Sequence, residues 1–269
     1  MLQHHINTSK ESNNIVFING IIYKNSYVIR AVTVLFSIYI PFLSLLELLC
    51  KMFYEPGKSK HGLPHDPFKS CVIPRPIGWI STLSKDGIAN LAPYSQFQQL
   101  TFDPPYVMFA ANQNTLAKRK DSVENAEQTG EFVWNMATYD LRDAVNKSGE
   151  EVGPEIDEFE IAGVKKEPSS LIKSPRVKES PIHFECKYYS TLRLPGNGDM
   201  GSANIIIGRV IGIHISDDAL TPQGLIDVIK IRPIARLGYY DYTSVESIFE
   251  MIIPGKNEKA RLGMRGRQI

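Results

Sequence analysis

Residues 71–97 read CVIPRPIGWISTLSKDGIANLAPYSQF, and they decide the fold more than any other stretch of the chain. Lys85-Asp86-Gly87 separates two apolar runs, which predicts a β-hairpin because glycine accepts the positive φ of a tight turn. The second strand runs into APYSQF at 92–97, where Pro93 removes a hydrogen-bond donor. We therefore expect strand pairing to stop or bulge there. Backbone N–H groups at such a strand end can bind a flat, acceptor-rich ligand.

The chain downstream of Met52 is rich in strand patterns and has few helical ones. We expect a helix from about Asp121-Ser122, which would cap it, to Gly130, and a second over 139–148. Several short strands with turn signals favour a barrel over a doubly wound sheet. The predicted strands are 76–83, 87–92, 105–111, 131–137, 181–194, 203–216 and 227–237. The proline-containing segment 150–180 is interpreted either as a surface excursion or as a lid.

Composition narrows the class of protein. The 269 residues are 43% hydrophobic and 22% charged with a net charge of +1, which is ordinary for a globular protein and gives no reason to expect a nucleic-acid partner. The three cysteines, Cys50, Cys71 and Cys186, form no C-x-x-C pair, so we expect no disulfide framework, no metal site and a reducing, cytoplasmic compartment. His61 and His65 are four apart, but Gly62 and Pro64 exclude the helix that would pair them on a metal.

The two ends differ from the middle of the chain. Residues 31–46, AVTVLFSIYIPFLSLL, are uncharged but short for a membrane span. Segment 1–51 is therefore a membrane anchor that would touch the bilayer through 28–50, a helix packed on the core, or an extension that precedes a true start at Met52. The tail 256–269 carries five bases and one acid, and we expect a solvated, mobile end, with a membrane-surface or polyanion contact as the alternative.

A basic run meets a predicted helix start at Lys118-Arg119-Lys120-Asp121-Ser122. Helix N-terminal N–H groups and nearby cations favour an anion such as phosphate, while Asp121 would repel it and serve as a cap. The alternative is a solvated basic run before a capped helix. Neither a G-x-G-x-x-G fingerprint nor a P-loop is present, so any nucleotide must be held in another way. Arg75, between two prolines, is aimed at an anionic ligand or forms a rim salt bridge.

Several segments, in order, resemble the flavin reductase-like family of FMN-binding split barrels. The resemblance covers about residues 52–254 and leaves out both ends. It implies a domain at 52–255 between the 1–51 extension and the 256–269 tail. The matching segments are PRPIGWISTLSKDGIANLAPYSQF (74–97), DPPYVMFAA (103–111), KDSVENAEQTGEFVWNMA (120–137), DEFEIAGV (157–164), SPRVKESPIHFECK (174–187), IIIGRVIGIHI (205–215) and RPIARLGYYDYTSV (232–245).

The resemblance implies a six-stranded antiparallel split barrel, usually a homodimer, with FMN near the subunit interface. It also implies hydride transfer from NADH or NADPH to flavin. A non-catalytic FMN-binding or flavin-storage protein is the alternative, and no acid, base or metal ligand is assigned. The implied cofactor-binding residues are Ser81 and Thr82 near the phosphate and ribityl chain, Asn90, Ala92, Pro93, Tyr94 and Ser95 around the isoalloxazine ring, and Lys120 and Ser122 at the phosphate.

Overall fold

The computed structural model describes residues 16–18, 21–23, 52–113, 118–198, 201–252 and 254. The chain divides into two compact units, Met1–Asp66 and Pro67–Ile269. Within the first unit, β1 (Val16–Ile18) and β2 (Ile21–Tyr23) form an antiparallel hairpin. The apolar run 31–46 and the tail 256–269 lie outside the described residues. No helix in the described part of the chain is long and apolar enough to cross a membrane.

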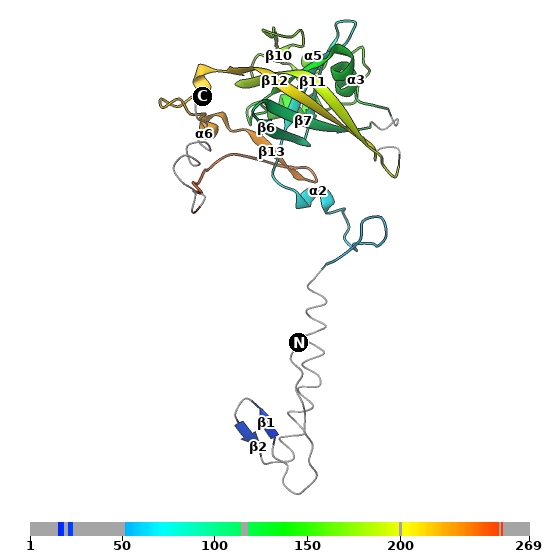
Figure 1. The fold of residues 1–269 in the computed structure, drawn as a ribbon, viewed down its shortest axis with the longest axis vertical. Coiled ribbons are helices and arrows are strands. Elements are labelled where there is room, and N and C mark those ends of the chain that lie inside the picture. Colours follow the sequence, from blue (N-terminus) through cyan, green and yellow to red (C-terminus); the bar gives the residue numbers. More distant parts are fainter. Residues whose placement is uncertain are drawn as a thin grey trace. The chain divides into compact units, whose positions relative to one another are not determined.

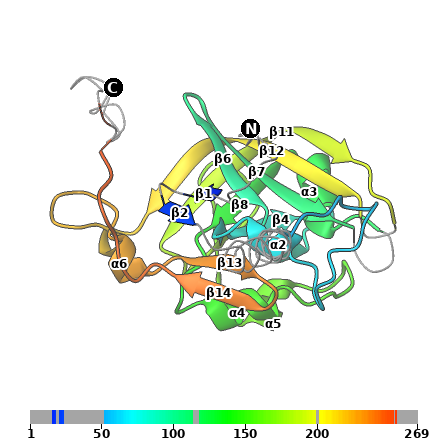
Figure 2. The same cartoon turned by 90° about the horizontal axis from the view of Figure 1, so that it is seen from below.

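The second unit is built on a seven-stranded sheet in which every neighbouring pair is antiparallel. The long strands β11 and β12 run side by side through its middle (Figures 1 and 2). The strand order is β5 (Ala89–Tyr94), β4 (Gly78–Leu83), β8 (Glu131–Asn135), β11 (Ile182–Leu194), β12 (Ala203–Ile215), β7 (Pro105–Asn112) and β6 (Phe97–Phe102). The mainly antiparallel prediction is confirmed, with seven strands in this sheet rather than six.

Two smaller sheets complete the described part of this unit. One joins β14 (Asp241–Ser244), β13 (Ile234–Gly238) and β3 (Arg75–Pro76), and the other joins β9 (Lys166–Glu167) and β10 (Arg176–Val177). The helical segments are α2 (Phe68–Cys71), α3 (Asp121–Thr129), α4 (Arg142–Lys147), α5 (Glu158–Ala162), the 3-10 turn η1 (Asp217–Ala219) and α6 (Val228–Ile231).

The predicted hairpin between β4 and β5 is present. Gly87 has a φ of +85°, and its N–H donates to the Ser84 carbonyl over 3.1 Å. The expected break at Pro93 is wrong, because Pro93 pairs with Trp79 and Tyr94 pairs with Gly78. β5 is the last strand of its sheet, so one side of it has no neighbouring strand and the donor that proline lacks is tolerated.

Other boundaries need correction. The predicted strand 227–237 is instead the short helix α6 followed by β13, because Asp227 caps a turn by accepting from the Lys230 N–H. β6 and β14 were not predicted. α3 begins at Asp121 and ends before Gly130, which adopts the left-handed conformation at φ +74°. The residue at its N-cap is Lys120, whose side chain makes no capping bond, so the predicted Asp121-Ser122 cap is wrong.

Side chains alternate between two hydrophobic clusters along β4. Ile80 belongs to a cluster on one face of the sheet, with Phe109, Phe132 and Ile206. Trp79 belongs to a second cluster on the other face. Successive strand residues point to opposite faces, so one strand contributes to both. The second cluster also contains Leu91 of β5 and Phe159 of α5, and α4 and α5 lie together on this side (Figure 2).

Segment 150–180 is fixed to the sheet over its second half. The fully buried Glu185 carboxylate accepts the N–H groups of Ser170 and Leu171, each at 2.7 Å. Glu131 accepts those of Lys173 and Ser174, at 2.6 and 3.0 Å. This part of the segment is therefore an anchored surface excursion rather than a lid.

Candidate functional site

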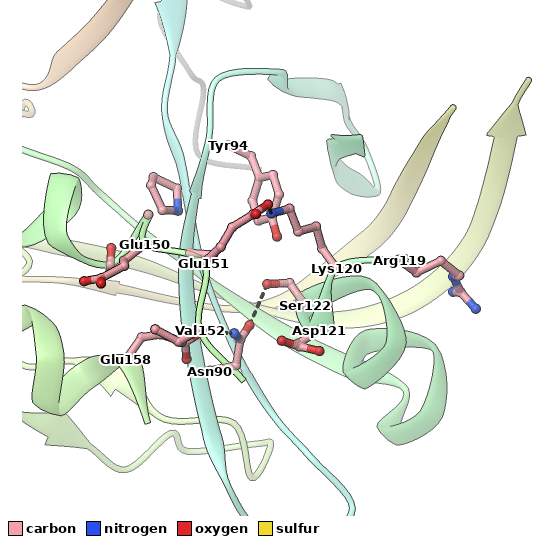
Figure 3. Close-up of a pocket in the computed structure, with 14 residues that line it drawn as sticks. Asn90, Tyr94, Arg119, Lys120, Asp121, Ser122, Glu150, Glu151, Val152 and Glu158 are labelled. Atoms are coloured by element: carbon pink, nitrogen blue, oxygen red, sulfur yellow. Dashed lines mark hydrogen bonds and ion pairs between the residues drawn. The ribbon is translucent and has the colours of Figure 1, made fainter. Parts of the chain in front are cut away.

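A pocket lies where β5, the start of α3 and the segment 148–158 meet (Figure 3). Its cavity volume is about 100 Å³, and it is partly open to solvent. Asn90, Ala92 and Tyr94 are alternate residues of β5 and so share the strand face that borders the pocket. The lining residues are Asn90, Ala92, Pro93, Tyr94, Arg119, Lys120, Asp121, Ser122, Ser148, Gly149, Glu150, Glu151, Val152 and Glu158.

Asn90 is the centre of the hydrogen bonding at the pocket floor. Its side-chain oxygen accepts from the Ser122 hydroxyl at 2.6 Å, the contact drawn in Figure 3. The same oxygen accepts from the Thr82 hydroxyl at 3.2 Å. Its side-chain nitrogen donates to Glu158 Oε1 at 2.6 Å, and the Leu91 N–H donates to Glu158 Oε2 at 3.2 Å. One amide thus ties together strands β4 and β5 and helices α3 and α5.

Acidic side chains outnumber basic ones around this pocket. The lining contains two basic residues, Arg119 and Lys120, and four acidic ones, which are Asp121, Glu150, Glu151 and Glu158. Arg119 forms its ion pair with Glu127, which does not line the pocket. Lys120 Nζ lies 2.6 Å from Glu151 Oε1. Burial raises the pKa of Asp121, and the negative charge of Glu124 adds to the effect.

Burial also shifts the ionisation of two other lining residues. It raises the pKa of Glu158 from 4.5 to about 7, and the hydrogen bonds from Leu91 and Asn90 offset only part of this effect. The pKa of the Tyr94 phenol is raised above its usual range by burial. The Tyr94 phenol therefore stays protonated near neutral pH, whereas the Glu158 carboxyl titrates in that range.

The structure brings together six of the nine residues implied by the resemblance. Asn90, Ala92, Pro93, Tyr94, Lys120 and Ser122 line the pocket. Ser81 and Thr82 do not line it and are fully buried: the Ser81 hydroxyl donates to the Pro175 carbonyl at 2.6 Å, and Thr82 accepts from Asn125 Nδ2 at 3.1 Å. Ser95 is half-buried and lies outside the pocket lining.

The carboxylates on segment 148–158 were not among the predicted site residues. The sequence shows an acidic stretch there, but no local pattern connects it to β5 or to α3, some 30 to 70 residues away in the chain. Arg75 does not line the pocket, and its guanidinium donates instead to the backbone carbonyls of Lys69 and Val72. Cys71 and Cys186 are free, and no cluster of the described residues is suited to bind a metal ion.

The raised pKa of Glu158 makes a prediction about stability. Between pH 4.5 and about 7 the folded protein keeps a proton on Glu158 that the unfolded chain has lost. The contribution of this proton to the free energy of unfolding is therefore complete below pH 4.5 and is lost as the pH rises through about 7. Glu158→Gln is neutral at every pH. Its stability relative to wild type should therefore increase by about 1–3 kcal/mol between about pH 5 and pH 8, measured by urea unfolding. Glu160→Gln, at an exposed position on the same helix, is the control. Parallel pH profiles for wild type and Glu158→Gln would refute the assignment.

Comparison with known proteins identifies the family. The flavin reductase like domain family matches residues 70–243. An uncharacterized protein of Aquifex aeolicus is 41% identical over 63% of this chain and 84% of its own length. Nitrilotriacetate monooxygenase component B from Bacillus cereus, at 28% identity, superposes with a TM-score of 0.69 over 75% of this chain and 99% of its own. A split-barrel protein of Shewanella frigidimarina, at 22% identity and a TM-score of 0.60 over 69% of this chain and 89% of its own, shares the fold. The split-barrel prediction is confirmed, and the chain belongs to the flavin reductase like domain family.

Proposed function

We propose that this protein is an FMN-binding oxidoreductase that transfers hydride from NADH or NADPH to flavin. The observation that carries the proposal is the pocket of a flavin reductase-like domain in which Lys120 and Ser122 stand at the start of a nine-residue helix. The similarity to component B of a monooxygenase supports a redox role over a purely structural one.

The donor set at the start of α3 fits a phosphate group. The first N–H groups of a helix have no carbonyl partners within it, and the helix dipole favours an anion there. Lys120 contributes an ammonium group, and the Ser122 hydroxyl contributes a donor that now serves Asn90. The carboxylates of the lining oppose an anion, and the one that contacts Lys120 directly is Glu151.

The residues of β5 in the lining are assigned to the remainder of FMN. We propose that Asn90, Ala92, Pro93 and Tyr94 border the isoalloxazine ring, with Ser95 continuing that border beyond the pocket lining. Thr82 donates to Asn90, so we assign it a positioning role beneath the site. Ser81 accepts from Asn135 Nδ2 at 3.1 Å, and neither residue lines the pocket, so we assign Ser81 no contact with FMN.

Little acid–base chemistry is required of these residues. When bound, the flavin supplies the ring that accepts electrons, and the nicotinamide supplies the hydride. The chain holds the phosphate at Lys120 and Ser122, orients the ring along β5, and reduces the access of water. Tyr94, as a neutral phenol, offers a hydrogen-bond donor without changing the charge of the pocket.

We also propose that the protein is a homodimer. Three isoleucines at the end of β12, Ile211, Ile213 and Ile215, are 36%, 55% and 43% exposed. A group of large exposed apolar side chains is typical of a protein–protein contact, and a second copy would cover it by symmetry.

The redox function is tested by nucleotide oxidation with the purified full chain. We expect FMN to bind, with a change in its visible absorbance, and NADH or NADPH to be oxidised only when FMN is present. Binding without oxidation of either nucleotide would contradict the enzyme and support the flavin-storage alternative. Failure to bind FMN or riboflavin would contradict both.

The phosphate assignment is tested with Lys120→Ala. Loss of one charge-assisted hydrogen bond should weaken FMN binding about ten- to a hundredfold, while riboflavin, which lacks the phosphate, should bind as before. Dissociation constants from fluorescence titration check this. Lys118→Ala is the matched control, since it removes one charge from the same basic run outside the pocket. Equal weakening of both ligands would show that Lys120 does not hold the phosphate.

The dimer is tested with Ile213→Glu, which places a charge in the proposed interface. Wild type should sediment as a dimer and the variant as a monomer. Tyr240→Glu is the control, because Tyr240 is 95% exposed and lies between β13 and β14 rather than on β12; this variant should stay dimeric. A monomeric wild type, or a dimeric Ile213→Glu, would overturn this assignment.

A further inference from the structure

The segment that closes one side of the pocket is fixed at both ends. At one end the buried Ser148 hydroxyl accepts from Trp79 Nε1 at 2.9 Å and donates to the Val145 carbonyl at 3.0 Å. At the other end Glu158 is held by Asn90 and by the Leu91 N–H. Residues 149–157 span the distance between these anchors, and the first four of them, 149–152, line the pocket.

Between these anchors, Glu151 reaches Lys120. Its carboxylate lies 2.6 Å from Lys120 Nζ, with the side chains 43% and 31% exposed, and Figure 3 shows the two extended toward each other. A phosphate at Lys120 must therefore either displace the Glu151 carboxylate or lie beside it at the cost of repulsion between like charges. Either way, FMN binding is opposed by a group that riboflavin would not meet.

We propose that Glu151 determines how strongly this site prefers phosphorylated over unphosphorylated flavin, by competing with the phosphate for Lys120. The inference rests on the proposed FMN function. It adds that the phosphate is held against an internal competitor, which weakens FMN binding and speeds FMN release.

Other acids of the lining have different positions. Asp121 is the first residue of α3, where a carboxylate stabilises the helix dipole whether or not a ligand is bound. Glu158 is directed to Asn90 and Leu91 at the floor. Glu150 is adjacent to Glu151 and carries the same charge, and the ion pair of Lys120 is with Glu151. Glu150→Gln is therefore a matched control for the loss of one negative charge at the pocket.

The experiment compares dissociation constants for FMN and riboflavin in wild type, Glu151→Gln and Glu150→Gln. Because an exposed ion pair is weak, Glu151→Gln should tighten FMN binding about three- to tenfold and slow FMN release by a similar factor. Riboflavin binding should not change. Glu150→Gln should have a clearly smaller effect. The gain in FMN affinity should shrink at high salt, which screens exposed charges.

The double variant Lys120→Ala/Glu151→Gln separates this inference from the proposed function. If Glu151 acts by competing for Lys120, its replacement should have little effect on FMN once Lys120 is gone. Selective loss of FMN affinity in Lys120→Ala with no gain in Glu151→Gln would overturn the competition while leaving the phosphate site intact. A gain of equal size for riboflavin would also overturn it. Loss of both ligands equally in Lys120→Ala would overturn the phosphate site itself, and the competition with it.

Discussion

Buried carboxylates that bind backbone N–H groups hold the connecting segments onto the sheet. A segment that crosses a sheet face cannot join its ladders, so its N–H groups need other acceptors. The Glu185 carboxylate accepts hydrogen bonds from two backbone N–H groups and from the His214 ring. Burial alone would raise the pKa of Glu185, but these hydrogen bonds outweigh it and hold the pKa below its usual value. At Glu158, burial outweighs a similar set of bonds and the pKa is raised instead. The same residue type is thus an ionised anchor in one place and a titrating group in the pocket.

The pocket exists because one uncharged amide accepts and donates at the same time. Asn90 accepts from hydroxyls on two elements and donates to a carboxyl on a third. A carboxylate at this position would accept from the hydroxyls but repel Glu158, and an apolar side chain would leave the buried Ser122 hydroxyl without its acceptor. Asn90 therefore sets the relative positions of β5, α3 and α5, and with them the position of Lys120 at the pocket mouth.

Local patterns predicted the hairpin, the isoleucine-rich strand β12 and the helix after Lys120, because turn chemistry and side-chain alternation act within a few residues. The strand β6 was missed because five of its six residues are exposed and give no apolar alternation. The acidic side of the pocket was also missed. Glu151 and Glu158 meet Lys120 and Asn90 through tertiary packing, which leaves no mark in the spacing of the sequence. The order of the family motifs predicted the split barrel, whereas the hydrogen bonds of Ser81 to Pro175 and Asn135, which do not line the pocket, could come only from the structure.

The proline within β5 has a consequence for the edge of the sheet. An edge strand presents unpaired N–H and C=O groups to which a strand from another molecule can add. Pro93 removes one of those donors. Gly149 also lies close to the Pro93 ring, since a Cβ added to this glycine would come within 3.5 Å of it. The edge is therefore interrupted at Pro93 and closely approached by another segment. The residue that borders the pocket is therefore also a barrier to edge-to-edge aggregation. The chain can leave this side of the barrel accessible to a small ligand without offering it as a template for a further strand.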